Sequence, residues 1–342
     1  MSSPRRRPLA LVLVAGVIVV ALVAIAAVLL LDPIPRRPLP TAGAATLPVA
    51  SPAPLAPGTV RVLAAGDIGR CGSAGAAATG AYLAAVPDAT VLALGDLAYD
   101  DGTPDQFAQC YDPVWGEVKD GTIAVPGNHD HRTAGLAGYT AELGAAGGDP
   151  AAPWRAVDLG AWRIYALDTA CEDVGGCGEG SPQLTWLRDD LAANPRACIL
   201  AIWHRARFSS GPHGSNTDTD PFWRALADAG ADVILNAHDH LYERFAPMDA
   251  DAQPAADGTR AFVVGTGGDE LYRAGTPIAG SEALWDRAFG VLELDLGPEG
   301  YAWRFQAVLG EPFTDAGTGT CGAPATVPGS SPEAAVAPSP AG

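Results

Sequence analysis

The chain has 342 residues, of which 41 are Gly, 30 are Pro and 48% are hydrophobic. Only 18% are charged, which excludes general disorder, because disordered chains are poor in apolar residues and rich in charge. With 39 acidic and 21 basic residues the net charge is −18, which disfavours nucleic-acid binding through a basic groove. The length suits one large domain or two small ones.

The N-terminal 58 residues read as an anchor followed by a linker. Residues 9–31 contain no charged side chain, and a helix of that length spans a bilayer core of about 30 Å. Arginines flank this segment, so we predict a signal anchor over residues 1–31, with a cleaved signal peptide as the alternative. Residues 32–58 are rich in Pro and Ala and predict a stiff spacer. We therefore expect an extracytoplasmic protein, anchored by its N-terminal helix, or secreted if that segment is cleaved.

The folded domain is expected over residues 59–321, because residues 322–342 form a Pro, Ala and Ser-rich tail that we predict to be disordered. All six cysteines lie within that domain, and an even count in an exported chain predicts disulfides. Six cysteines allow 15 pairings. The spacing favours only Cys171–Cys177, across a Gly-rich loop.

Short apolar runs alternate with helix-like stretches in this domain. Seven runs end abruptly in polar residues, at 60–65, 90–94, 122–125, 162–167, 198–203, 233–235 and 260–264. Such continuous runs fit strands buried on both faces. We predict helices over 74–86, 181–191 and 221–229, the second with Ser181 as its N-cap, and a hairpin of 291–296 with 301–308. The alternation predicts an α/β fold with an antiparallel portion.

Side chains that suit metal ions follow five of these runs. They are Asp67, Asp96, Asn128 with His129, His204, and His238 with His240. In open α/β sheets ligands bind outside the carboxyl ends of the strands, so we expect these side chains to meet at one edge. Oxygen and imidazole ligands in this number exceed the needs of one ion. Two metals that share a carboxylate promote in-line displacement at phosphorus.

Five sequence blocks, in the same order, resemble those of the calcineurin-like metallophosphoesterases. The blocks are GDIG (66–69), GDLAY (95–99), GNHD (127–130), His204 after an apolar run, and HDHLYER (238–244). The GDxG opening and the Tyr of GDLAY are similar to the purple acid phosphatase branch. The resemblance covers about residues 66–268 and implies a four-layer α/β/β/α sandwich with two mixed sheets.

The resemblance also implies a role for each matched residue. The first metal would be bound by Asp67, Asp96, Tyr99 and His240. The second would share Asp96 and add Asn128, His204 and His238. Because a Tyr99 phenolate needs a strong Lewis acid, we expect Fe(III) at its site and Fe(II), Zn or Mn at the second.

Two histidines outside the ligand set are expected to be catalytic. His129 follows Asn128, and both would contact the phosphoryl group. His213 comes nine residues after His204, where this branch often has a histidine. Either imidazole is suited to protonate the leaving group.

Three positions depart from the family pattern. Gly69 replaces the His of an Asp-x-His opening, so the first metal depends on Tyr99, and Ala237 stands where the family has Gly. After His204 the chain continues Arg-Ala-Arg, and Arg205 and Arg207 either bind phosphate or pair with surface acids.

Other polar residues near the blocks have a simpler structural reading. We expect His131 at the rim of the site and Asp168 as a loop cap, and Tyr242 with Arg244 as structural supports. GTGG (265–268) lacks the Lys of a phosphate-binding P-loop and predicts a tight turn. His238 and His240 alternate along what we expect to be an extended segment, which would place both rings on one side.

The resemblance as a whole implies an exported dinuclear-metal phosphatase. It would hydrolyse small phosphomonoesters by attack of a hydroxide generated at the metals. A phosphodiesterase or nucleotidase with the same metals is the first alternative, and a non-catalytic, metal-containing surface module is an alternative of another class. The expected partners are a small phosphate ester and, through the N-terminal helix, a membrane; no nucleic acid is expected.

Overall fold

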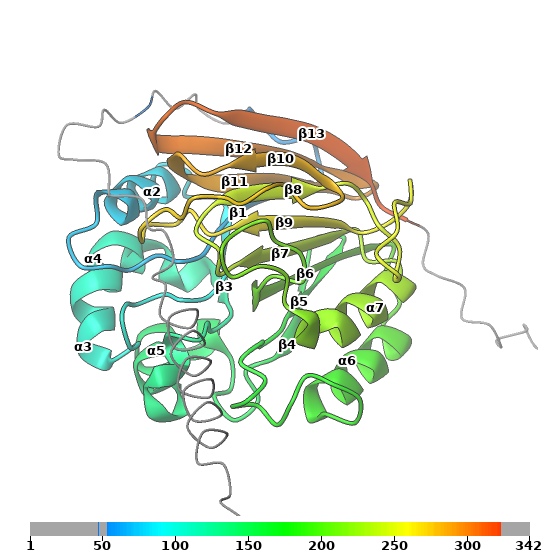
Figure 1. Ribbon diagram of the computed structural model, residues 1–342, viewed down its shortest axis with the longest axis horizontal. Coiled ribbons are helices and arrows are strands. Elements are labelled where there is room, and N and C mark those ends of the chain that lie inside the picture. Colours follow the sequence, from blue (N-terminus) through cyan, green and yellow to red (C-terminus); the bar gives the residue numbers. More distant parts are fainter. Residues whose placement is uncertain (1–46, 48–52, 323–342) are drawn as a thin grey trace, which may run out of the picture. The chain divides into compact units, whose positions relative to one another are not determined.

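Two mixed β-sheets with helices on their outer sides make up the protein (Figure 1). The structure, a computed structural model, describes residue 47 and residues 53–322. The first sheet has the order β13 (Thr314–Thr320), β12 (Gly300–Gly310), β11 (Ala288–Gly297), β1 (Val60–Ala65), β2 (Thr90–Ala93) and β3 (Thr122–Ala124). The second has the order β10 (Ser281–Trp285), β8 (Tyr242–Phe245), β9 (Arg260–Val264), β7 (Val233–Ala237), β6 (Cys198–Arg205), β5 (Trp162–Ala166) and β4 (Arg155–Leu159).

The helices separate into two groups, one on each side of the paired sheets (Figure 1). The first group is α2 (Ala74–Ala84), α3 (Pro104–Gln106), α4 (Asp112–Trp115) and α5 (Ala137–Leu143). The second is α6 (Pro182–Ala193) and α7 (Asp220–Asp228). Single turns join them: η1 (Phe107–Tyr111), η2 (Gly116–Gly121), η3 (Asp130–Arg132), η4 (Ala134–Leu136), η5 (Gly144–Gly147) and η6 (Thr217–Thr219). This is the expected four-layer arrangement.

Strands of the second sheet are apolar on both faces because each face packs against a different layer. In β6, Leu200 and Ile202 point into the core between the two sheets. Ala201 and Trp203, which alternate with them, point into the core beneath α6 and α7. The continuous apolar runs therefore identified buried strands correctly.

The predicted helices and the final hairpin are present, with small shifts at their ends. Ser181 caps α6 by accepting the backbone N–H of Leu184, as its position before Pro182 indicated. Four strands were not predicted, namely β4, β8, β10 and β13. Three of these, β4, β10 and β13, lie at sheet edges, where one side of the strand needs no apolar partner and the sequence signal is weak.

Three disulfides pair all six cysteines. Cys171–Cys177 is the predicted bridge. Cys71–Cys110 ties the loop after β1 to η1, and Cys198–Cys321 ties the start of β6 to the residue after β13. The last bridge therefore joins the two sheets covalently.

A second link between the sheets is polar and accounts for two residues of the last sequence block. Asp315 of β13 accepts hydrogen bonds from Tyr242 Oη at 2.6 Å, Arg244 Nε at 2.7 Å and Trp303 Nε1 at 3.2 Å. Tyr242 and Arg244 lie in β8 of the other sheet, so they serve as structural supports.

The predicted anchor (1–31) lies outside the described residues, as do most of the linker and all but the first residue of the tail. Within the described part of the chain, no helix is long and apolar enough to cross a membrane. Leu47, in the linker, donates its N–H to Val308 O at 2.9 Å and packs against the main core.

Candidate metal centre

The predicted ligands lie where strands of both sheets end. Strands β1, β2 and β3 run parallel in the first sheet, and β6 and β7 run parallel in the second. The loops that follow β1, β2, β3 and β7 carry Asp67, Asp96 with Tyr99, Asn128 with His129, and His238 with His240. The carboxyl ends of the strands thus assemble the site, as the general rule for α/β sheets requires.

His204 reaches this edge from within a strand, not from the loop after it as predicted. Strand β6 continues to Arg205, and its pairing with β7 shifts register between Ile202 and Arg205. The His204 ring is buried, and its Nδ1 lies 2.9 Å from Leu94 O. Nδ1–H therefore donates to that carbonyl, which leaves Nε2 free to bind a metal.

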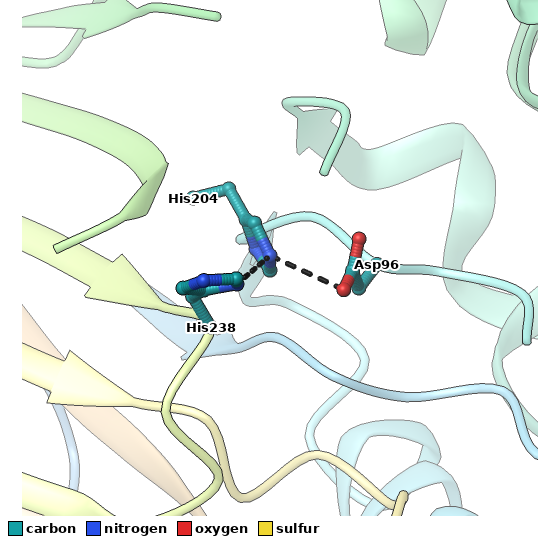
Figure 2. A group of neighbouring side chains, drawn as sticks. All are labelled: Asp96, His204 and His238. Carbon is teal, nitrogen blue, oxygen red and sulfur yellow. Dashed lines mark hydrogen bonds and ion pairs between the residues drawn. The ribbon is translucent and has the colours of Figure 1, made fainter. Parts of the chain in front are cut away.

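Asp96, His204 and His238 form one group of potential ligands (Figure 2). Their ligand atoms all lie within 4.8 Å of one another. His204 Nε2 is 3.2 Å from Asp96 Oδ2 and 3.2 Å from His238 Nδ1. One carboxylate and two imidazoles in this arrangement suit a borderline divalent ion.

Asp67, Tyr99 and His240 form a second group beside the first. Tyr99 Oη lies 2.8 Å from Asp67 Oδ1 and 3.2 Å from His240 Nε2. The same hydroxyl is 3.2 Å from Asp96 Oδ2, the oxygen that faces His204 in the first group. Asp96 therefore lies between the two groups, where a carboxylate shared by two ions has to be.

Both aspartates use one oxygen to hold the loops and turn the other toward the site. Asp67 Oδ2 accepts the N–H of His238 at 2.9 Å, and Asp96 Oδ1 accepts the N–H of His129 at 2.8 Å. Asp67, Asp96 and His238 have φ values of 59°, 52° and 73°, in the left-handed region. Non-glycine residues adopt this conformation at a cost of about 1–3 kcal/mol each and cluster at functional sites.

The segment that carries the last two histidines is bent, not extended as predicted. His238 is left-handed, and residues 238–241 connect β7 to β8 without strand pairing. The two rings consequently present different atoms: His238 turns Nδ1 toward His204, whereas His240 turns Nε2 toward Tyr99. His240 Nδ1 donates to Glu270 O, which fixes that orientation.

Burial and neighbouring charges shift the pKa values of three residues of the site. Burial alone would raise the pKa of Asp96, but the charge of His204 and its hydrogen bond have the larger effect and hold the pKa of this carboxyl below its ordinary value. Burial likewise opposes the charge of His204, yet Asp96 raises its pKa to about 9. Burial, together with Asp67 and Asp96, raises the pKa of Tyr99 well above its usual value. A metal ion would displace these protons and take over their charge.

Asn128 supplies an independent test of the fit. Its Oδ1 is buried and has no hydrogen-bond partner among the described residues. A buried acceptor without a partner is costly, and a metal ion satisfies it. The donor set of carboxylates, imidazoles, a phenol and an orphaned amide oxygen therefore fits a metal centre.

The two predicted catalytic histidines lie beside the ligands and reach the surface. The His129 ring packs on Tyr99 with centroids 4.5 Å apart, and its Nε2 is 3.9 Å from Asp96 Oδ2. His213 is exposed and stacks on His238 at 4.1 Å. Their roles toward a substrate remain predictions.

Nearby polar residues mostly bind one another. Arg205 pairs with Glu172 at 2.9 Å and Arg207 pairs with Asp220 at 2.8 Å. Of the two roles considered for these arginines, phosphate binding and pairing with acids, the structure shows the pairing. His131 Nε2 lies 2.7 Å from the buried Asp168. This pair is more than a rim residue and a loop cap, because it connects the loop after β3 to the end of β5.

The GTGG segment packs against the first sequence block. Gly267 N–H donates to Gly66 O at 2.9 Å. A Cβ on Gly265 would lie 2.2 Å from Asp239 O, so the close approach requires glycine there. Ala237, which stands where the family has Gly, packs against Gly66. A Cβ on Gly66 would lie 2.5 Å from the Cβ of Ala237. Glycine at 66 makes room for alanine at 237.

Sequence reasoning missed three residues that support the site. Asp130 is buried and accepts the N–H groups of Leu97 and Gly127. Burial and Asp96 raise its pKa to about 7. Asp239 binds the loop of His213, and Tyr272 stacks on His240. Asp130 and Asp239 stand inside the quoted blocks, but Tyr272 carries no sequence signal of its own.

Comparison with known proteins agrees with this geometry. The model of the calcineurin-like phosphoesterase domain matches residues 60–242, more than half of the chain. The chain belongs to the calcineurin-like phosphoesterase family. It is therefore a hydrolase that acts on phosphoester bonds, and the family implies a dinuclear metal centre. No curated protein sequence matches this phosphoesterase significantly.

Solved structures confirm the fold. The purple acid phosphatase PPD1 of yellow lupin superposes with a TM-score of 0.65 at 19% identity, over 77% of this chain and 54% of that one. The phosphoesterase thus spans about half the length of the lupin enzyme. GAP50, the anchor in the inner membrane complex of Plasmodium, has a TM-score of 0.58 at 14% identity, over 78% of this chain and 89% of that one. At 14–19% identity these likenesses show the fold.

Proposed function

We propose that this phosphoesterase is an exported phosphatase that hydrolyses small phosphomonoesters at a dinuclear metal centre. The observation that carries the proposal is the position of Asp96 Oδ2, 3.2 Å from both Tyr99 Oη and His204 Nε2. Two groups of potential ligands that share one carboxylate match the needs of a two-metal site. Two bound ions would neutralise phosphoryl charge and activate water.

The chain's own residues would divide the remaining work. Asp67, Tyr99 and His240 would hold one ion, Asn128, His204 and His238 the other, and Asp96 both. His129 and His213 would bind the phosphoryl oxygens, because their rings border the ligands and reach the surface. An imidazole there is suited to hold the proton that the leaving oxygen takes up.

Purified full-length protein provides the test, with a chromogenic phosphomonoester and the matching diester as substrates. We expect a large preference for the monoester, and at least a hundredfold loss of kcat in both Asp96→Asn and His204→Ala. Asp88→Asn is the matched control, because Asp88 is exposed in the turn before β2, at the opposite end of the strand. A preference for the diester would favour a phosphodiesterase or nucleotidase.

A non-catalytic role is the second candidate. Its support is the fold shared with GAP50, which is described as an anchor. Metal bound at the expected ratio with no hydrolysis of either ester would establish this alternative. The complete set of candidate ligands favours catalysis instead, since an anchor needs no shared carboxylate.

Tyr99 carries the proposal for metal identity. Its hydroxyl lies 2.8 Å from Asp67 Oδ1 and 3.2 Å from Asp96 Oδ2, and burial and these carboxylates raise its pKa well above the usual value, so a strong Lewis acid is needed to remove the proton. We propose Fe(III) at this position, with Fe(II), Zn or Mn at the other. The loaded protein should show a visible charge-transfer band that disappears in Tyr99→Phe. A colourless, active protein with only zinc or manganese contradicts the iron assignment.

The proposed location rests on the cysteines and on the apolar segment. All six cysteines are paired, which is typical of oxidising compartments. We propose that residues 1–31 anchor the enzyme. N-terminal sequencing of the mature protein should find residues before Leu31. A mature protein that begins at Ala45 would show that it is secreted.

A further inference from the structure

Two aromatic rings from outside the ligand set cover the site's last two histidines. Tyr272 lies parallel to His240, with centroids 3.9 Å apart and an angle of 8° between the planes. His213 stacks on His238 at 4.1 Å and 27°. The covering rings also touch each other, with His213 and Tyr272 centroids 5.6 Å apart. The imidazoles of the two ligand groups are thus joined by a continuous aromatic cover.

The loops that carry the two covering rings are bonded to one another. Gly275 N–H donates to Ser210 O at 2.7 Å, and Ile278 N–H donates to Ser210 Oγ at 2.9 Å. On the other side, Asp239, between the two ligand histidines, accepts the N–H of His213 at 2.9 Å. Movement of either loop would therefore be passed to the other and to the ligand segment.

Tyr272 has the stronger hold on its histidine. Its N–H donates to His240 O at 2.9 Å, so ring and backbone both bind the same residue. His240 is then restrained at three points. Its ring Nδ1 bonds to Glu270 O, one face of the ring lies against Tyr272, and its backbone carbonyl accepts the N–H of Tyr272. A ring restrained in this way turns Nε2 toward Tyr99 and Asp67.

We infer that Tyr272 is a positioning residue for the metal position at Tyr99. This inference rests on the proposed dinuclear site. It adds that the ring of Tyr272, rather than its hydroxyl, keeps His240 oriented as a ligand. Groups that orient a metal ligand typically contribute 10–100-fold to metal affinity. Losing the ring should therefore empty the Tyr99 position and leave the one at His204 filled.

The test compares Tyr272→Leu with Tyr272→Phe in the full-length protein, after dialysis against a metal chelator of graded concentration. We expect Tyr272→Leu to retain one metal ion per chain where the wild type retains two, to lose the visible band of Tyr99, and to lose at least tenfold in kcat with little change in KM. Tyr272→Phe should keep both metal ions, the visible band and the wild-type kcat, because it keeps the ring.

Tyr301→Leu is the matched control for lost packing. Tyr301 is also a buried aromatic, but it lies at the opposite end of the first sheet, in register with Leu296 beside Val60. This variant should lower thermal stability and keep both ions. If Tyr272→Leu behaves like Tyr301→Leu, or if Tyr272→Phe fails to restore metal binding, the inference is wrong while the proposed function stands. A wild-type protein without bound metal overturns both.

Discussion

The ion pair of His131 with Asp168 should stabilise the domain and hold the loop after β3, which carries Asn128 and His129. His131 Nε2 lies 2.7 Å from Asp168 Oδ2; the carboxylate is fully buried and the imidazole is 10% exposed. Among the described residues, the side-chain carboxylate of Asp168 accepts only one other hydrogen bond, from the N–H of Ala170 at 2.8 Å. Replacing His131 by Ala would leave a buried carboxylate poorly compensated, which typically costs about 3 kcal/mol.

A double-mutant cycle isolates the interaction from the loss of packing. Urea unfolding, followed by tryptophan fluorescence, would be measured for His131→Ala, Asp168→Asn and the double variant. We expect the double variant to be more stable than the sum of the single effects predicts, by about 1–3 kcal/mol. The pair of Arg188 with Glu179 is the control, because both side chains are exposed and should show no measurable coupling.

The same pair predicts a pH dependence. Burial lowers the pKa of His131, but Asp168 and Asp173 outweigh burial and raise it above 6.5. The stabilisation by His131 is therefore complete at a pH below the pKa that this residue has in the unfolded protein. It is lost as the pH rises through the higher pKa that it has in the folded protein. The stability difference between wild type and His131→Ala should therefore shrink as the pH rises above 6.5. Coupling no larger than in the control pair, or a difference independent of pH, would refute this reasoning.

Three further perturbations have definite expected outcomes. Replacing Cys198 and Cys321 by Ala opens a loop of 123 residues and should cost about 5 kcal/mol, against about 2 kcal/mol for Cys171 and Cys177, whose separation is 6; urea unfolding measures both. Gly127→Ala places a Cβ 2.1 Å from Oδ1 of Asp96, so kcat should fall at least tenfold while the circular dichroism spectrum is unchanged. Removing metal with a chelator should abolish turnover and lower Tm, and adding metal back should restore both.

The sequence predicted which candidate ligands lie together because each one follows a signal that is local. A buried strand is recognisable from a few consecutive residues, and the rule that ligands bind at carboxyl ends then places Asp67, Asp96 and Asn128 together. The helix cap at Ser181 is equally local, since it needs only the Ser-Pro pair. These features depend little on contacts between distant parts of the chain.

Features that arise from distant contacts escaped prediction. His238 is left-handed because Asp67, 171 positions earlier, binds its N–H. Strand β13, a Thr and Gly-rich edge, is held by Trp303, whose ring occupies the space that a Cβ on Gly317 would fill. Tyr272 becomes part of the site only because its loop folds over His240. No short window of sequence contains such information.

We expect the scaffold to hold the candidate ligands in place without help from a bound ion. Three left-handed residues, Asp67, Asp96 and His238, cost about 3–9 kcal/mol in sum. The covalent and polar links between the sheets act against this cost, and the Cys198–Cys321 bridge alone contributes about 5 kcal/mol. Small zinc domains differ, because they lack such a frame and fold only when the metal binds. Metal loss should therefore leave this enzyme folded but inactive, with strained aspartates that remain in place for the returning ions.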